Sequence, residues 1–333
     1  MGETMRALVY TAPGQVRLEE VPRPHLAAGE VEIAVAAAGI CGSDISGFLG
    51  RSRLRVPPLV LGHELVGRTP DGRRVAANPL SNCGICGRCR DGATNLCRNL
   101  RLLGMDDVAG CFAEFAAVPA AQVYEIPDDL PDARAVLAEP LANVVHLFRL
   151  AAPQPGFRMG ILGAGTMGSL ALLTALRLGA REVLVLDVNE ARLAAARRMG
   201  ATLAVNAADE EGQSEAREFA GEGLDLVLDA SSNGAARKAA FDLCRPGGLV
   251  VLLGMGKEPS EIDFASSVRK ELRVAMSFGY TTRDFERSLE LLKAGAVDLT
   301  PWTAEMPLAE GQKAFDRMAA CPGDTLRMVL RVS

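Results

Sequence analysis

Three glycines near the middle of the chain, Gly163, Gly165 and Gly168, form a G-x-G-x-x-G pattern between a strand-like run and a helix-like run. In a dinucleotide-binding turn, the first glycine permits the tight bend, the second admits a pyrophosphate to the backbone, and the third lets the helix pack closely on the strand. Thr166 and Met167 would then open the helix, whose free N–H groups and dipole favour a phosphate. The same triplet also occurs in ordinary turns, so the surrounding sequence decides its meaning.

The residues that follow this pattern alternate between strand-like and helix-like runs. Strands are expected at 158–162, 182–187, 203–206, 224–229, 249–254 and 273–277, and helices at 166–178, 190–199, 214–220 and 234–243. This βαβ alternation is typical of a doubly wound parallel sheet, an α/β fold. The glycine pattern falls in the first βα turn of the region, where a dinucleotide site belongs.

Asp187 closes the second strand-like run, 19 residues after Gly168. A carboxylate at this point can accept hydrogen bonds from both hydroxyls of the adenosine ribose and would repel a 2′-phosphate, which favours NAD over NADP. The alternative is an aspartate that only caps a turn or a helix. Arg192 is either a contact for the adenine or a residue on a solvated helix face.

Four cysteines, Cys83, Cys86, Cys89 and Cys97, have the spacing C-x2-C-x2-C-x7-C within a lobe at residues 82–98. Four thiolates satisfy tetrahedral zinc, and such a site contributes directly to local folding. Because the lobe has no histidine and four thiolates leave no position open, the zinc would be structural. The alternatives are free or disulfide-bonded cysteines, or an iron–sulfur cluster.

A second group is more widely spaced: Cys41, His63 and Glu64, with Glu139 as a further ligand or a carboxylate behind the ligands. Thiolate, imidazole and carboxylate make a catalytic zinc set if one coordination position stays open. Such a zinc acts as a Lewis acid on an alcohol oxygen. The alternative is that Cys41 is a small core residue and His63 a satisfied polar group.

With 333 residues, the chain is long enough for two domains of roughly 100–200 residues each. Its opening third has short strand-like runs and many turn residues, as in a β-rich domain. The end of the chain is too short for a domain of its own, and we expect it to complete the first one.

The net charge of −5 gives no basic excess that would indicate a nucleic-acid partner. No apolar run approaches the roughly 20 residues of a membrane helix, and residues 1–10 do not resemble a secretory leader. We therefore expect a cytoplasmic protein whose eight cysteines serve as metal ligands, reactive thiols or core residues rather than as disulfides.

Together these motifs resemble those of the zinc-containing medium-chain dehydrogenases, in the alcohol and polyol branch of the sorbitol and threonine dehydrogenases. The resemblance is carried by residues 39–44, 62–64, 110–115 and 139–142, by the four-cysteine lobe, and by the glycine pattern with Asp187. It implies a GroES-like catalytic domain at 1–145 and 284–333, split around a Rossmann NAD-binding domain at 146–283. It also implies a homodimer or homotetramer.

The resemblance assigns a role to each residue of the catalytic group. Cys41, His63 and Glu64 become ligands of a catalytic zinc, which Glu139 binds directly or through water, and the four-cysteine lobe holds a second zinc. Ser43 matches the hydroxyl that takes the proton of the substrate alcohol. Asp44 resembles the acid that orients the zinc-bound histidine. Ser46 stands where many relatives have a histidine that completes the proton relay, so the relay here ends at Ser46, the ribose or water.

The resulting prediction is an NAD-dependent zinc dehydrogenase acting on a small-molecule alcohol. A secondary alcohol of a polyol, cyclitol, sugar or amino alcohol is favoured. Two alternatives stay open: a reductase that works physiologically on a carbonyl, and a non-catalytic zinc protein that binds NAD(H).

Overall fold

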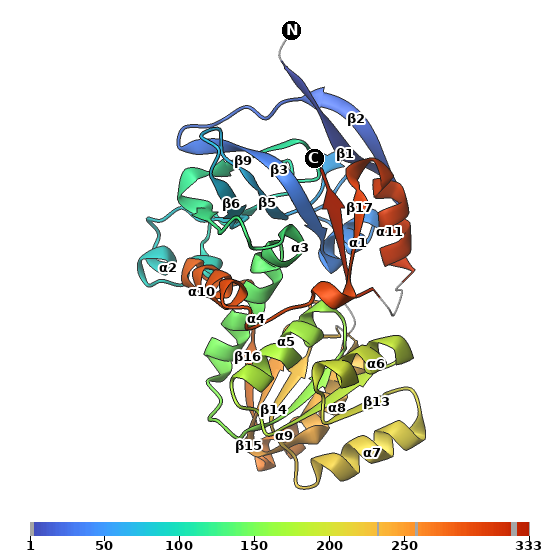
Figure 1. The fold of residues 1–333 in the computed structure, drawn as a ribbon. Coiled ribbons are helices and arrows are strands. Elements are labelled where there is room, and N and C mark those ends of the chain that lie inside the picture. Colours follow the sequence, from blue (N-terminus) through green and yellow to red (C-terminus); the bar gives the residue numbers. More distant parts are fainter. Residues whose placement is uncertain (1–2, 232, 257–258, 321–324, 333) are drawn as a thin grey trace. The chain divides into compact units, whose positions relative to one another are not determined.

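The computed structural model describes residues 3–231, 233–256, 259–320 and 325–332 (Figure 1). Its contacts divide the chain into two compact units. The first comprises Met1–Glu139, Thr281–Gly295 and Leu299–Ser333, and the second comprises Pro140–Tyr280 and Ala296–Asp298.

The chain first passes between the units within a helix rather than in a loop. Helix α4 (Ala138–Ala151) begins in the first unit and continues in the second. The crossings at 139/140 and 280/281 differ by a few residues from the expected domain limits at 145/146 and 283/284. At the first crossing a continuous helix gives the sequence no break to mark the change.

The first unit is built mainly of strands. These are β1 (Thr4–Ala12), β2 (Gln15–Pro22), β3 (Glu30–Ile40), β4 (Leu59–Val60), β5 (Glu64–Arg68), β6 (Arg74–Ala77), β7 (Leu80–Ser81), β8 (Arg101–Leu102), β9 (Phe115–Pro119), β10 (Val123–Glu125), β17 (Thr303–Pro307) and β18 (Arg327–Arg331). They form sheets in the orders β2-β1-β4, β10-β6-β5-β3-β18-β17 and β7-β8, and β9 also pairs with β3. Its helices are α1 (Gly42–Phe48), α2 (Gly87–Arg90), α3 (Asp132–Ala135), α10 (Thr282–Lys293) and α11 (Gly311–Ala319), with short 3-10 turns at Thr94–Leu96, Ala120–Gln122, Thr300–Trp302 and Leu308–Glu310.

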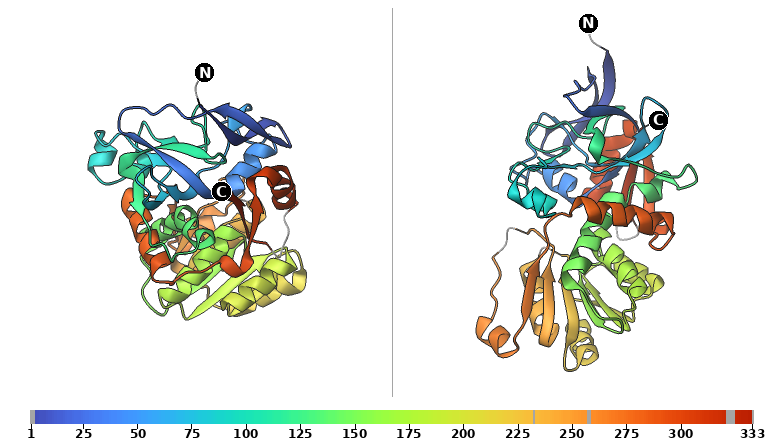
Figure 2. Two further views of the ribbon diagram at one scale, coloured as in Figure 1. Left: turned by 45° about the horizontal axis from the view of Figure 1, so that its top comes forward. Right: turned by 90° about the vertical axis from the view of Figure 1, so that its left-hand side faces the viewer.

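The C-terminal residues complete the sheet and the core of this unit. Strand β18 pairs antiparallel with β3, so that the end of the chain, in red, lies beside the first third, in blue (Figures 1 and 2). Phe315 of α11 packs against Phe48 and Phe112, with ring centroids 5.0 and 5.8 Å apart. Burying each such ring contributes about 1.5–3 kcal/mol, which holds the returning segment in place.

The second unit alternates strands and helices. In chain order they are β11 (Arg158–Leu162), α5 (Thr166–Arg177), β12 (Glu182–Asp187), α6 (Glu190–Met199), β13 (Leu203–Asn206), α7 (Glu210–Ala220), β14 (Leu224–Asp229), α8 (Gly234–Leu243), β15 (Cys244–Leu252), α9 (Phe264–Arg269) and β16 (Arg273–Met276). The strands pair in parallel in the order β13-β12-β11-β14-β15-β16. This is the Rossmann order, and it confirms the predicted fold class.

Two elements of this unit are longer than predicted. Helix α7 begins at Glu210 rather than at 214, since Asp209, Glu210 and Glu211 give a favourable charge to its first turn although they show no apolar periodicity. Strand β15 begins at Cys244 rather than at 249 and pairs irregularly with β14. Its first residues include Pro246 and two glycines, which weaken any strand signal.

Among the described residues, no helix combines the length and the apolar character that crossing a bilayer requires.

Candidate metal centres and nucleotide site

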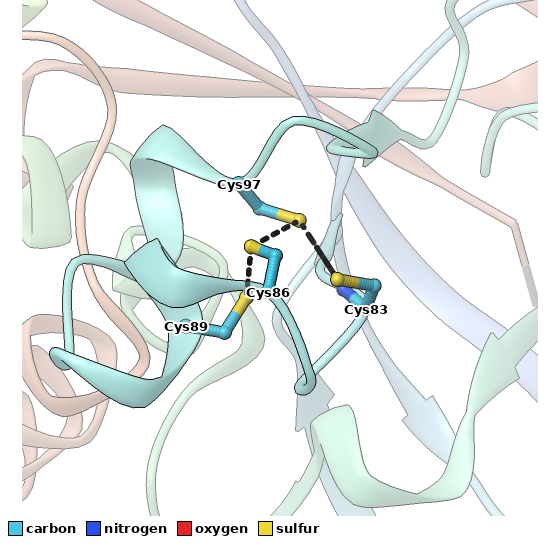
Figure 3. Close-up of side chains that lie close together, drawn as sticks. All are labelled: Cys83, Cys86, Cys89 and Cys97. Carbon is cyan, nitrogen blue, oxygen red and sulfur yellow. Dashed lines mark hydrogen bonds between the residues drawn. The ribbon is translucent and has the colours of Figure 1, made fainter.

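The four lobe cysteines converge around one point (Figure 3). Neighbouring sulfur atoms lie 3.5 Å apart for Cys86 and Cys89, 3.9 Å for Cys86 and Cys97, and 3.5 Å for Cys83 and Cys97. Zinc–sulfur bonds of about 2.3 Å would place tetrahedral sulfurs about 3.8 Å apart, so the group fits zinc. All four thiols are free, which removes the disulfide alternative for these residues.

Backbone N–H groups prepare this loop for a cation. The amides of Cys83 and Asn99 each donate to the Cys97 sulfur over 3.4 Å. Hydrogen bonding to the backbone at Cys89 contributes most to lowering the pKa of Cys86 to about 6. The loop therefore stabilises negative sulfur at Cys86 and Cys97 without any charged side chain among these contacts, whereas burial and the neighbouring thiols raise the pKa of Cys89 to about 12.

The second group is assembled by the register of the main sheet. Gly39 of β3 pairs with Glu64 of β5, so the end of one strand meets the start of the other. Cys41 follows β3 and caps α1, and His63 immediately precedes β5. The ligand atoms of Cys41, His63 and Glu64 all lie within 4.8 Å of one another. His63 and Glu64 are buried and Cys41 is half-buried. Three donors therefore converge, which suits a catalytic zinc whose fourth position is taken by water or substrate.

Asp44 orients this group from behind. Its Oδ1 lies 3.4 Å from His63 Nδ1, which leaves Nε2 as the ring nitrogen for a metal, and its Oδ2 accepts the Cys41 N–H over 3.0 Å. Burial disfavours the ionised carboxyl, but His63 and Arg55 outweigh it and lower the pKa of Asp44. Burial likewise disfavours the charged ring, but Asp44 and Cys41 raise the pKa of His63 to about 10.

Glu139 lies apart from the other three ligand candidates. It is buried in the first turn of α4, and its charge raises the pKa of Cys41, against the stronger lowering effect of His63. Among the residues that the structure describes, however, the group within 4.8 Å consists of Cys41, His63 and Glu64 without it. Direct binding by Glu139 and binding through water both stay predictions.

Ser43 lies beside Cys41 in the first turn of α1 and is half-buried. Its Oγ accepts a hydrogen bond of 3.1 Å from Arg55 Nη2. Ser46 is on the same helix, one turn further along, and is also half-buried. The hydroxyl expected to take the substrate proton is therefore next to a ligand and under the influence of a cation.

In the second unit, each glycine of the central pattern meets a different constraint. Gly163 has φ +103°, and a Cβ atom there would lie 3.1 Å from the Ser231 backbone. A Cβ atom at Gly168 would collide with the Gly163 carbonyl oxygen. At Gly165 the nearest such neighbour is Arg192 Nη1, 4.0 Å away, so the backbone is open there. The open second glycine leaves the room that a pyrophosphate needs.

A cavity of about 810 Å³ lies against this turn and is lined by Gly163, Gly165, Asp187 and Arg192, among others. Asp187 accepts the Ala164 N–H at 2.6 Å and the Asn189 N–H at 2.9 Å, so it closes turns as well as facing the cavity. Arg192 Nη1 lies 4.0 Å from its carboxylate, and this arginine also lines the cavity, so its contact with the adenine stays a prediction. Thr166 and Met167 open α5 and are half-buried.

Comparison with known proteins identifies the family. A profile described as "Alcohol dehydrogenase GroES-like domain" matches residues 27–128, and one described as "Zinc-binding dehydrogenase" matches 166–294. An L-threonine 3-dehydrogenase of Anaeromyxobacter sp. (strain K) is 35% identical over 314 residues, which cover 90% of each chain. The chain belongs to the zinc-containing medium-chain dehydrogenases.

Solved structures of similar proteins carry both kinds of nicotinamide cofactor. An alcohol dehydrogenase of Escherichia coli CFT073 in complex with NADH has a TM-score of 0.91 and 27% identity, and the match covers 99% of this dehydrogenase and 100% of that chain. A zinc-binding dehydrogenase of Sinorhizobium meliloti 1021 bound to NADP has a TM-score of 0.90 and 29% identity, with the same coverage. The family predicted from the sequence is thus confirmed, and the comparisons leave the choice of cofactor open.

Two buried arginines of this dehydrogenase escape the sequence analysis. Arg327 of β18 forms an ion pair with Glu64, and both side chains are almost fully buried. A Cβ atom at Gly39 would collide with both partners, so this glycine makes room for the pair. The other is Arg55. Arg327 lies in a mostly apolar run and Arg55 follows two other arginines, and neither pattern says where the side chain points.

Proposed function

We propose that this protein is an NAD-dependent zinc dehydrogenase that oxidises a secondary alcohol of a small polyol, cyclitol, sugar or amino alcohol. The proposal is carried by the convergence of Cys41, His63 and Glu64 beside Ser43. A zinc ion held there would polarise the hydroxyl oxygen of the alcohol and stabilise the charge that develops on it. The relative named L-threonine 3-dehydrogenase supports an amino alcohol or a polyol as the class of substrate.

We propose two zinc ions per chain. Cys41, His63 and Glu64 would hold the catalytic ion, with Glu139 as a direct ligand or a carboxylate acting through water. The four lobe cysteines would hold the structural ion, since their spacing and their sulfur separations both suit tetrahedral zinc. Metal analysis of the purified chain tests the number directly.

Ser43 would remove the hydroxyl proton. Its oxygen has two lone pairs, and Arg55 occupies one of them. The second can accept the proton of the substrate hydroxyl while Ser43 passes its own proton onward. Arg55 has no acceptor and takes no part in the relay. The relay then continues to Ser46, the cofactor ribose or water.

NAD is proposed as the cofactor because Asp187 lies at the cavity beside the glycine turn. A carboxylate there favours the two ribose hydroxyls and opposes a 2′-phosphate. Asp187→Ala should lower kcat/KM for NAD by about tenfold or more and improve use of NADP. The matched control is Glu190→Ala, which removes the same charge from an exposed position three residues further along. An unchanged preference in Asp187→Ala would contradict the assignment.

The activity itself is tested by assaying the zinc-loaded protein with polyols, cyclitols, amino alcohols and simple secondary alcohols. We expect NAD reduction that depends on the alcohol. Turnover with carbonyl compounds and NADH alone would favour the reductase alternative. A protein that holds two zinc ions and NADH but turns over neither class would be the non-catalytic alternative.

A homodimer or homotetramer is proposed from the free edge of the second sheet. Strand β16 is the last in the sheet order, and its Val274 and Met276 are 45% and 78% exposed. Phe264 and Val268 of the adjoining α9 are 72% and 74% exposed. An apolar edge strand is a template for pairing with a second copy. Light scattering of the wild-type chain and of Met276→Lys tests this, and we expect the variant to dissociate.

The cytoplasm is proposed as the location. All seven cysteines described as free could in principle be oxidised, and four of them form a thiol cluster that suits a metal. Such clusters persist where thiols are kept reduced. Fractionation of cells that express the protein tests the location.

A further inference from the structure

Arg55 lies in the loop between α1 and β4 and points inward. It is 6% exposed, whereas Arg51 and Arg53 of the same loop are exposed. Its Nη2 donates to Ser43 Oγ over 3.1 Å, and its Nε lies 3.5 Å from Asp44 Oδ1. A guanidinium is therefore held one hydrogen bond from the hydroxyl that is proposed to take the proton of the substrate alcohol.

The fold makes room for this inward position. The stem of Arg55 crosses α1 at Gly47, where a Cβ atom would lie 2.7 Å from Arg55 Cδ and 3.0 Å from its Cβ. Any larger residue at position 47 would push the arginine away. Gly47 and Arg55 thus act together to bring the positive charge to Ser43.

The guanidinium has donors to spare. It carries five N–H bonds, of which one is used by Ser43. On Nη1 the acceptor is the thioether of Met105 at 4.0 Å, a weak one, and Nε makes no hydrogen bond. The nearby Asp44 carboxylate is shared with His63 and with the Cys41 amide. A buried arginine with unused donors is best satisfied by a carboxylate or phosphate, which it can grip with two parallel hydrogen bonds.

We propose that Arg55 binds an anionic group of the substrate, so that the preferred alcohol carries a carboxylate or a phosphate close to the reacting carbon. This rests on the proposed dehydrogenase function. Because Arg55 and the substrate hydroxyl would share Ser43, the anionic group belongs on the hydroxyl-bearing carbon or near it. Arg55 is then a specificity-determining residue, which selects hydroxy acids and phosphorylated polyols over neutral alcohols.

The test uses substrate pairs that differ only in the anionic group. L-threonine is compared with L-threoninol, 3-hydroxybutyrate with butane-1,3-diol, and galactitol 1-phosphate with galactitol. The first two pairs report on a carboxylate and the third on a phosphate. Each pair is measured with wild type, Arg55→Met, Arg55→Lys and the control Arg53→Met, which removes an exposed charge from the same loop.

We expect wild type to prefer the anionic member of at least one pair. In Arg55→Met that preference should fall by about ten- to a hundredfold, because the anionic member loses much more kcat/KM than its neutral partner, and through KM more than kcat. Arg55→Lys should retain part of the preference, and Arg53→Met all of it. Calorimetric binding of the same pairs to the zinc-loaded protein with NADH should show the same change in Kd ratio.

Three results would overturn the proposal. Wild type could favour only neutral alcohols, Arg55→Met could lower both members of each pair equally, or the binding ratio could be the same in wild type and Arg55→Met. The second result would mean that Arg55 only positions Ser43. A failure of the proposed function looks different, since no alcohol of either kind would then reduce NAD.

Discussion

The proposed structural centre would take its ligands from one loop between residues 83 and 97. The proposed catalytic centre would take Cys41 from the N-cap of α1, His63 from the residue before β5 and Glu64 from the start of β5. The thiols of the loop are supported by backbone N–H groups. The catalytic ligands are supported instead by buried charged side chains, Asp44 and Arg327.

This difference separates a site that a metal helps to fold from a site that the sheet holds in advance. A short loop without a core of its own depends on its ion for structure. The catalytic ligands sit where β3 and β5 pair, so their backbone is placed by the main sheet. The charged groups around these ligands are buried, however, and a buried charge destabilises the fold strongly when its partner is removed. Losing a ligand of the loop centre should therefore disorder only the loop. Losing a charged partner in the catalytic centre should lower the stability of the fold.

The largest effect should come from Cys41→Ala. It removes a catalytic ligand, so the alcohol is no longer polarised, and kcat/KM should fall by about a thousandfold or more. Metal analysis should show one zinc in place of two, with an unchanged circular dichroism spectrum. The control is Cys244→Ala, a buried cysteine of the second unit that should leave activity intact. Normal activity in Cys41→Ala would contradict the assignment of the catalytic centre.

Next is the charge pair behind the catalytic ligands. Arg327→Met leaves the Glu64 carboxylate buried without its cation, which should cost about 3–5 kcal/mol in the free energy of unfolding. Denaturant unfolding of the zinc-free protein measures this, and the double variant Glu64→Gln/Arg327→Met should recover part of the loss.

A matched control lies on the same strand. Arg331 pairs with Glu305 over 3.2 Å, with both side chains exposed. Arg331→Met should change the free energy of unfolding by less than about 1 kcal/mol, as is usual for surface ion pairs. If Arg327→Met and Arg331→Met lowered the free energy of unfolding equally, burial of the Arg327–Glu64 pair would not explain its contribution to stability.

Local patterns made the fold and much of the site predictable. The glycine turn, the individual strand and helix runs and the cysteine spacing are each defined by residues close together in the sequence. The flanking residues then favour one structural interpretation of each pattern. The start of β15 could not be predicted from local pattern, because its proline and glycines disfavour a strand. It is recognised as a strand only from its pairing with β14.

Arg55 and Arg327 show what sequence patterns omit at the site. Arg327 meets Glu64 only because β18 pairs with β3, far away in the sequence, and Gly39 then leaves space for both. Arg55 turns inward only because Gly47 lets its stem pass. In both cases the position of the arginine side chain depends on a glycine in a different element. Spacing along the chain does not reveal that the two residues meet.

A third prediction concerns the loop centre. Cys97→Ser should release the structural zinc and raise amide exchange in residues 82–98 by about ten- to a hundredfold, while kcat changes less than about threefold. Hydrogen exchange with mass spectrometry, together with metal analysis, measures both effects. Loss of both zinc ions, or exchange that spreads into β3 and β5, would mean that the two centres are not independent.

The smallest effect is the pH dependence of zinc uptake by the catalytic centre, measured in Cys97→Ser so that the loop does not contribute. Without metal, His63 has a pKa of about 10 and holds a proton that zinc must displace, whereas its pKa of about 6.5 in an unfolded chain would leave the ring neutral at pH 8. Burial raises the pKa of Cys41, but the hydrogen bond and charge of His63 outweigh burial and lower it, which favours the thiolate.

One proton should therefore leave per zinc, and the affinity should rise about tenfold per pH unit between pH 7 and 9 before levelling near pH 10. Chelator competition at several pH values measures the slope. Asp44→Asn removes the carboxylate that does most to raise the pKa of His63, so the slope should flatten at a lower pH. A slope of two in the parent would show that Cys41 is a thiol and that the buried charges do not prepare this centre for its metal.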